Sequence, residues 1–116
     1  MDVHVNRTPV SGRVLRVNFK RGRFLPAYHR DAAMANEHSE IWIEHNGQTI
    51  VFRQLVGILA RRVVCRVQAG AQLKAGERVG LMKFGSRMDV FLPTSAQLRV
   101  SVGDRVIGGV TVIATL

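Results

Sequence analysis

The chain has 116 residues, which is enough for one compact domain and too few for two. Seventeen Lys and Arg against eight Asp and Glu leave a net charge of +9, which favours polyanions or anionic lipid surfaces through long-range attraction. A single cysteine excludes a disulfide within the chain. The longest apolar run, residues 55–60, is far shorter than the roughly 18 residues that cross a bilayer, so any membrane contact is expected to be peripheral.

Short alternating runs rich in β-branched residues follow one another along the chain, and no window keeps a helical period for long. Asn46 and Gly47 predict a type I′ hairpin, because both turn positions require positive φ. Residues 31–38 predict one short helical turn. Strands are predicted, in chain order, at residues 10–19, 40–45, 49–54, 58–67, 79–83, 88–92, 97–100 and 111–114. Cys65 lies in one of these alternating runs and is predicted to be a small core residue.

Two segments, residues 67–76 and 100–109, share the spacing V-x-x-G-x-x-(L/V)-x-x-G. Each copy predicts a strand end, a glycine turn, an inward apolar residue and a second glycine turn, with Leu73 and Val106 as the inward residues. Paired copies of this pattern resemble the biotinyl and lipoyl carrier domains. The expected fold is therefore mainly β, a flattened barrel-sandwich hybrid like that of the carrier domains, with little helix.

The segment Phe84-Gly85-Ser86-Arg87 contains a peptide bond of a kind that can cleave itself. The Ser86 hydroxyl can attack the Gly85 carbonyl, and elimination of the resulting ester leaves dehydroalanine, which hydrolyses to an N-terminal pyruvoyl group. Glycine suits the acyl side because it has no Cβ to block the attack. A Gly-Ser pair alone is far more often only a turn, so the surrounding sequence decides.

Residues 2–12 and 78–93, together with Phe24-Leu25-Pro26-Ala27 and Asn36-Glu37, resemble the phosphatidylserine decarboxylases, most closely the short form of bacteria and archaea. The resemblance implies one domain over residues 1–116 that cleaves itself between Gly85 and Ser86, into chains 1–85 and 86–116. It implies a covalent pyruvoyl cofactor made from Ser86, with no metal. The implied reaction, decarboxylation of phosphatidylserine to phosphatidylethanolamine, is a lyase step of phospholipid biosynthesis at the cytoplasmic face of the membrane.

The same resemblance implies the site residues. Ser86 and His4 are expected to be catalytic, and the expected substrate-binding residues are Arg87, Lys83, Asn36 and Glu37. Many members carry a second histidine where this chain has Arg7, so His4 is expected to serve both maturation and decarboxylation. Members also have a segment upstream of this motif, and we expect the chain to mature poorly without it. His38 and His45 lack metal-ligand spacing and are predicted to be surface residues.

Two other classes stay open on the residues alone. Leu81-Met82-Lys83-Phe84 partly matches the hairpin that carries biotin, which would make Lys83 the attachment site of a carrier domain. A basic β-barrel that binds nucleic acid would also fit the charge, but such proteins usually add exposed aromatic residues or a known module. The expected partners are phosphatidylserine, an anionic membrane surface and the chain's own cleaved fragment, with no nucleic acid, while the oligomeric state is left open.

Overall fold

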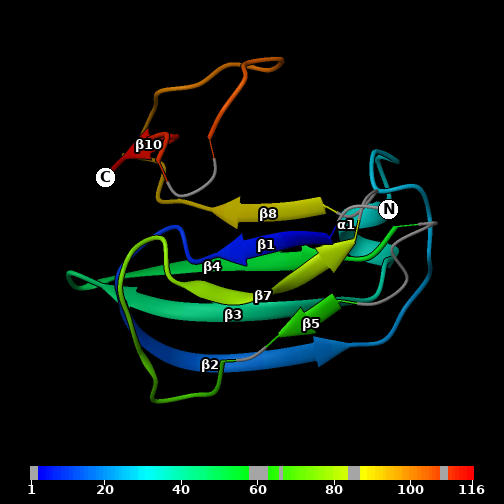
Figure 1. The fold of residues 1–116 in the computed structure, drawn as a ribbon, viewed down its shortest axis with the longest axis horizontal. Helices are drawn as coiled ribbons and strands as arrows, with labels where there is room; N and C mark the ends of the chain where they lie inside the picture. Colours follow the sequence, from blue (N-terminus) through cyan, green and yellow to red (C-terminus); the bar gives the residue numbers. More distant parts are fainter. Residues whose placement is uncertain (1–2, 58–62, 66, 84–86, 108–109) are drawn as a thin grey trace.

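Three long antiparallel strands form the centre of the fold in this computed structural model, which describes residues 3–57, 63–65, 67–83, 87–107 and 110–116 (Figure 1). The single helix among these residues has four residues. In chain order the elements are β1 (Val3–Arg7), β2 (Gly12–Lys20), α1 (Ala32–Ala35), β3 (His38–His45), β4 (Gln48–Leu55), β5 (Val63–Cys65), β6 (Gln72–Leu73), β7 (Arg78–Lys83), β8 (Arg87–Phe91), β9 (Gln97–Leu98) and β10 (Ala114–Thr115). The prediction of a mainly β fold with little helix is confirmed.

The largest sheet is antiparallel, has the strand order β6-β2-β3-β4-β8 and curls around the core (Figure 1). Strands β3 and β4 pair without a register shift from His38 opposite Leu55 to His45 opposite Gln48. Asn46 and Gly47 join them with φ angles of 49° and 80°, which confirms the predicted hairpin.

A smaller sheet with the order β1-β7-β5 packs against the inner face of the large sheet. Alternate residues of the central strands point into the space between the sheets, because side chains along a strand alternate between its two faces. Cys65 of β5 is half-buried against this core, as predicted. The buried side chains of the core are Val14, Ile41, Ile43, Ile50, Phe52, Leu73 and Val79. Burial of each large apolar side chain contributes about 1.5–3 kcal/mol.

Gly12 starts β2 at a point where the backbone of β3 passes very close. A Cβ built on Gly12 would lie 1.8 Å from the Glu44 carbonyl oxygen, and the φ of Gly12 is 149°, which other residues rarely adopt. Only glycine therefore fits at this end of β2.

The strand predictions hold best in the central sheet. The predictions for residues 10–19, 40–45, 49–54, 79–83 and 88–92 correspond to β2, β3, β4, β7 and β8. Of the predicted strand 58–67, the structure describes Val63–Cys65 as β5, and residues 58–62 and 66 lie outside the described residues. The prediction for 97–100 was too long, and that for 111–114 overlaps β10 only at Ala114. Strands β1 and β6 were not predicted.

The two copies of the glycine-spaced pattern differ in burial. Gly70 and Gly103 both have a φ of 91°, so the first glycine turn of each copy is confirmed. Leu73 is 6% exposed and belongs to the core, whereas Val106 is 53% exposed. The prediction that Val106 points inward was wrong, because it belongs to the exposed C-terminal segment beyond β8 and not to the core between the two sheets.

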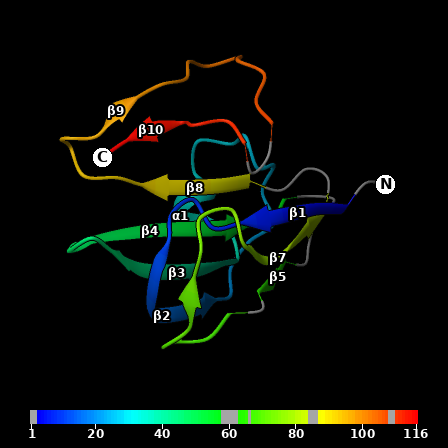
Figure 2. The ribbon, with the colours of Figure 1, turned by 60° about the vertical axis from the view of Figure 1, so that its left-hand side comes forward.

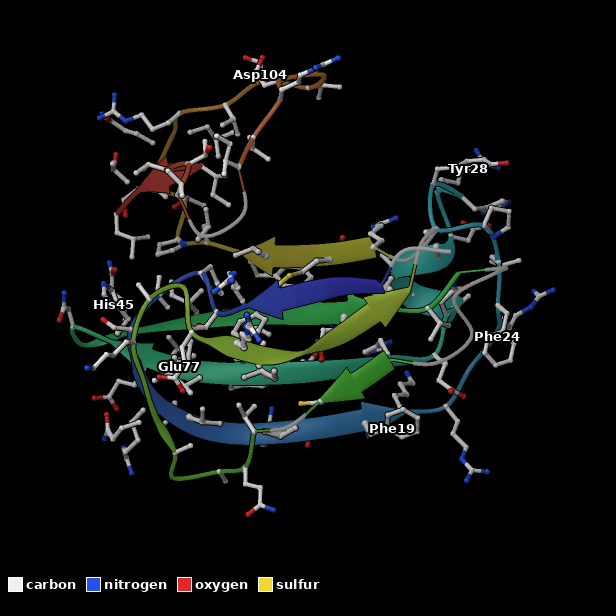
Figure 3. All side chains as sticks on the ribbon, viewed as in Figure 1. Phe19, Phe24, Tyr28, His45, Glu77 and Asp104 are labelled. Carbon is white, nitrogen blue, oxygen red and sulfur yellow. The ribbon has the colours of Figure 1, made fainter. Side chains whose placement is uncertain are left out.

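Beyond β8, the described residues from Pro93 to the C-terminus form an arm, and Figure 2 shows it leaving the two sheets through β9 and coming back through β10. Asp104 lies at its far tip (Figure 3). Apolar side chains of the arm are largely exposed, among them Leu98, Val102, Ile107 and Val110. None of the described residues forms a helix that is long and apolar enough to cross a membrane.

Candidate functional site

The predicted cleavage segment connects the two facing sheets at one end of the molecule. Strand β7 of the small sheet ends at Lys83, and β8 of the large sheet begins at Arg87. Figure 1 shows the start of β1, α1, the end of β7 and the start of β8 at the same end. Gly85 and Ser86 lie outside the described residues, so cleavage between them stays a prediction.

Strand β1 brings the backbone of His4 to this end. In the antiparallel pairing of β1 with β7, Val3 lies opposite Lys83 and His4 lies opposite Met82. His4 is thus aligned with a residue only four positions before Ser86, although the two are far apart in the sequence. Only the backbones of His4 and Lys83 are described, so the roles assigned to their side chains stay predictions.

The Arg87 side chain holds the start of β8 against the loop that precedes α1. Its Nε donates to Oδ1 of Asp89 at 2.6 Å, and its Nη2 donates to Oδ2 at 2.9 Å. Its Nη1 donates to the Ala27 carbonyl oxygen at 3.0 Å. The hydrogen bonds to Asp89 raise the pKa of Arg87, burial opposes this, and the negative charge of Asp89 adds to it. Three of the five guanidinium N–H groups are thereby used within the protein, and substrate binding by Arg87 stays a prediction.

Asn36 also holds the loop that precedes α1, through hydrogen bonds of its side-chain amide. Its buried Nδ2 donates to the carbonyl oxygens of Leu25 and Val56, both at 2.8 Å, and its Oδ1 accepts from the Leu25 N–H at 3.0 Å. The Glu37 N–H donates to the Arg23 carbonyl oxygen at 3.0 Å, and the Glu37 carbonyl oxygen accepts from the Val56 N–H. The family resemblance implies that Asn36 and Glu37 bind substrate. The structure shows their contacts with the loop, and their contact with substrate stays a prediction.

His38, which was predicted to be a surface residue, is buried. Only 6% of it is exposed, and its Nδ1 lies 2.8 Å from the Asn36 carbonyl oxygen, which assigns the proton of a neutral ring to Nδ1. The prediction was wrong because α1 and its loop cover this end of β3, a long-range arrangement that spacing does not reveal. His45 is partly buried, and its Nδ1 donates to the Ser11 carbonyl oxygen at 2.7 Å.

A polar network follows His38 along the outer face of the sheet. Glu40 accepts hydrogen bonds from Trp42 Nε1 at 2.6 Å and from Arg53 Nε at 2.7 Å. Burial tends to raise the pKa of Glu40, but the hydrogen bonds from Trp42 and Arg53 and the positive charge of Arg53 outweigh it, so the pKa is lowered. The outer face of β3 and β4 is therefore held by satisfied, charged contacts.

Gln54 is the exception on the inner face. Its side chain is fully buried, and neither Nε2 nor Oε1 has a hydrogen-bond partner within the part of the chain that the structure describes. It lies opposite Ser39 of β3 and Met88 of β8. An unpaired buried polar group costs about 1–3 kcal/mol, so an apolar residue would be more stable here. The sequence analysis missed Gln54, although a polar residue continues the inward series Ile50, Phe52, Gln54.

A groove of about 490 Å³ separates the arm from β1 and β8. Its walls include Arg7, Pro9, Met88, Val90, Val110 and Ile113. Among the residues that the structure describes, none of the predicted site residues lines it, and no three His, Cys, Asp or Glu side chains gather as metal ligands.

The chain is similar to proteins of one family over nearly its whole length. The sequence model of the family described as phosphatidylserine decarboxylase matches residues 1–114. The phosphatidylserine decarboxylase proenzyme of Wolbachia sp. subsp. Brugia malayi is 43% identical over 117 residues, which cover 100% of this chain and 51% of that protein. The proenzyme of Rickettsia akari is 45% identical over 114 residues, which cover 97% of this chain and 49% of that protein. The chain thus spans about half the length of these relatives. No solved structure matches it significantly.

Proposed function

The chain belongs to the phosphatidylserine decarboxylase family, and we propose that it is the catalytic portion of an enzyme that converts phosphatidylserine to phosphatidylethanolamine and carbon dioxide. The observation that carries this proposal is the family match over residues 1–114, which includes both strands that flank the predicted cleavage site. The relatives are named proenzymes, which supports a chain that is processed before it acts.

Maturation begins at the bond between Gly85 and Ser86. The Ser86 oxygen adds to the Gly85 carbonyl carbon, the bond from that carbon to the Ser86 nitrogen breaks, and the nitrogen gains the proton that the hydroxyl lost. Loss of the Ser86 α-proton then releases the Gly85 carboxylate and leaves dehydroalanine. Addition of water and departure of ammonia yield the ketone. In this scheme His4 carries the proton between the hydroxyl and the leaving nitrogen.

The pyruvoyl group supplies a carbonyl that, once joined to the substrate amine, accepts the electrons left behind when carbon dioxide departs. The residues at this end of the fold fit such a group, because the buried Gln54 amide has donors and an acceptor to offer it. Lys83 and Arg87 come from the two strand ends beside Ser86 and would attract the phosphate or carboxylate of the substrate. His4 would return a proton to the product carbon.

The test compares two proteins expressed from the full-length gene, the unsubstituted protein and Ser86→Ala. The intact mass of each shows whether the chain has been cleaved. We expect the unsubstituted protein to break after Gly85 and the Ser86→Ala variant to stay whole and lose decarboxylation, because alanine has no hydroxyl to attack or to become the ketone. Ser95→Ala, at an exposed position, is the matched control and should cleave normally. An uncleaved Ser86→Ala protein that still decarboxylates phosphatidylserine would refute the proposal. A biotin or lipoyl adduct on an intact chain would instead identify a carrier domain.

A further inference from the structure

One end of the molecule exposes large apolar side chains on and beside the loop that joins β2 to α1. Tyr28 in this loop is 90% exposed, and Phe19 near the end of β2 is 60% exposed. Met34 of α1 is 78% exposed. Figure 3 shows Phe19 and Tyr28 at the same end of the molecule, on its right-hand side. Exposed apolar side chains that gather at one place indicate a surface that a partner covers.

Basic side chains lie among these apolar residues. Lys20, Arg21, Arg23 and Arg30 are all exposed, and the one acidic residue between positions 19 and 34 is Asp31. None of the four basic side chains forms an ion pair within the part of the chain that the structure describes. Their charges are therefore available to an anionic partner. The exposed side chains of residues 19–34 are called the end surface below.

The loop that carries the end surface is held in place by contacts of its backbone. The Arg23 N–H donates to the Ala35 carbonyl oxygen at 2.8 Å, and the Glu37 N–H donates to the Arg23 carbonyl oxygen at 3.0 Å. The Ala27 carbonyl oxygen accepts a hydrogen bond from Arg87, at the start of β8, at 3.0 Å. The end surface is thus displayed on an ordered backbone, so a partner that binds it does not have to order the loop first.

The hydrogen bond between Arg87 and Ala27 also joins the end surface to the end of the fold where β7 ends and β8 begins (Figure 1). The proposed substrate is a phospholipid, whose headgroup lies at the surface of a bilayer. An enzyme that acts on such a headgroup must turn its reacting end toward the bilayer. Anionic headgroups attract Lys and Arg, so the charge of the end surface is complementary to such a bilayer.

The composition of the end surface favours a bilayer over a nucleic acid. Tyrosine concentrates at the interface between membrane and water, where its ring contacts acyl chains and its hydroxyl stays hydrated. Lys and Arg side chains keep their charged ends among the headgroups while their stems contact apolar groups. Single-stranded nucleic acid uses similar residues, but it requires a groove that follows the strand. The groove beside the arm contains no residue of the end surface.

We propose that the end surface docks on an anionic phospholipid bilayer and orients the β7–β8 end of the fold toward the headgroups. Phe19 and Tyr28 enter the interface between headgroups and acyl chains. Arg21 and Arg30 bind lipid phosphates. The choice of a bilayer as the partner rests on the proposed function, because it takes a phospholipid to be the substrate.

The experiment measures sedimentation of the full-length gene product with vesicles of phosphatidylglycerol and phosphatidylcholine. Phosphatidylglycerol supplies negative charge without a serine headgroup, so this binding does not depend on the proposed reaction. We expect the double variant Arg21→Glu, Arg30→Glu to weaken binding by about 30-fold or more, because each basic residue near an anionic membrane contributes about fivefold. The matched control is Arg99→Glu, Arg105→Glu, at exposed positions of the arm. It changes the net charge equally and should weaken binding far less.

Two further variants separate the apolar from the charged contribution. Tyr28→Ser should weaken vesicle binding by about fivefold, because membrane binding grows with the apolar area that is buried. Val102→Ser removes an equally exposed apolar side chain from the arm and should leave binding unchanged. The double variant Arg21→Lys, Arg30→Lys keeps both charges and should bind normally.

The outcomes separate this inference from the proposed function. Equal losses in the Arg21, Arg30 pair and the Arg99, Arg105 pair would overturn the inference, because net charge alone would then explain binding. An unsubstituted protein that does not sediment with the vesicles, or that binds an oligonucleotide more tightly through the end surface, would also overturn it. Either result can occur in a protein that cleaves itself and decarboxylates normally. Vesicle binding through the end surface by a protein that never cleaves would refute the proposed function and leave the docking surface standing.

Discussion

Buried polar groups near the outer face of β3 and β4 differ in their hydrogen bonding from the one on the inner face. On the outer face, both oxygens of the Glu40 carboxylate accept hydrogen bonds, and just before β3 the Asn36 amide is hydrogen-bonded at both its nitrogen and its oxygen. On the inner side, the Gln54 amide has no such bond among the described residues. The polar groups that hold a loop and a strand in place are thus satisfied within the folded chain, whereas the buried Gln54 amide carries a cost of about 1–3 kcal/mol.

The largest expected effect on stability comes from Asn36→Leu. The substitution leaves the partly buried N–H and carbonyl of Leu25 and the buried carbonyl of Val56 without their partner. We expect a loss of about 2–4 kcal/mol in the free energy of unfolding, measured by urea denaturation in the Ser86→Ala background. Asn18→Leu, at an exposed position of β2, should change it little. If Asn36→Leu is as harmless as Asn18→Leu, the contrast between the two faces fails.

A smaller, pH-dependent effect is expected for Glu40→Gln. The folded-state pKa of Glu40 lies below the ordinary value of 4.5, so the ionised carboxylate stabilises the fold above that pH. This contribution is lost as the pH falls below 4.5 towards the folded-state pKa. Glu40→Gln should therefore lower the free energy of unfolding by about 1–2 kcal/mol at pH 7 and by progressively less in acid.

The control for this titration is Glu44→Gln. Glu44 is half-exposed and lies 3.8 Å from Arg13, and exposed pairs of this kind contribute little. The free energy of unfolding should be measured for each variant and for the unsubstituted protein between pH 3 and pH 7. We expect the difference between Glu40→Gln and the unsubstituted protein to shrink as the pH falls. The difference for Glu44→Gln should stay small and nearly constant. If the difference in the free energy of unfolding caused by Glu40→Gln were the same across this range, the charge of the Glu40 carboxylate would not be what stabilises the outer face.

The smallest expected effect is that of Arg16→Ala. The Arg16 guanidinium lies 4.2 Å from the centre of the Trp42 ring on the outer face, and exposed contacts of this kind contribute about 0.5–1 kcal/mol. Because the chain has one tryptophan, the change should also shift Trp42 fluorescence. Arg30→Ala, at another exposed arginine, should leave both the stability and the spectrum unchanged.

Much of this hairpin could be predicted because its signals are local. The alternation of Ile41 and Ile43 marks one face of β3, and Asn46 with Gly47 marks the turn. The candidate cleavage bond was likewise found from adjacent residues and a family resemblance that the comparisons bear out. His38 was misjudged because its cover, α1 and its loop, comes from a different part of the chain. Gln54 was missed because a glutamine in a strand looks the same whether or not it has a partner.

The sequence by itself determined the strand period, the hairpin and the first glycine turn of each copy of the repeated pattern, since φ preferences and side-chain alternation act between neighbouring residues. The tertiary structure decided burial. Leu73 and Val106 hold the same place in that pattern, yet one lies in the core and the other on the exposed arm. It also decided that β1 places the His4 backbone opposite Met82 and that β4 places Gln54 opposite Met88. Such pairings join residues that are distant in the chain, and their energies depend on which surfaces meet when the two sheets pack.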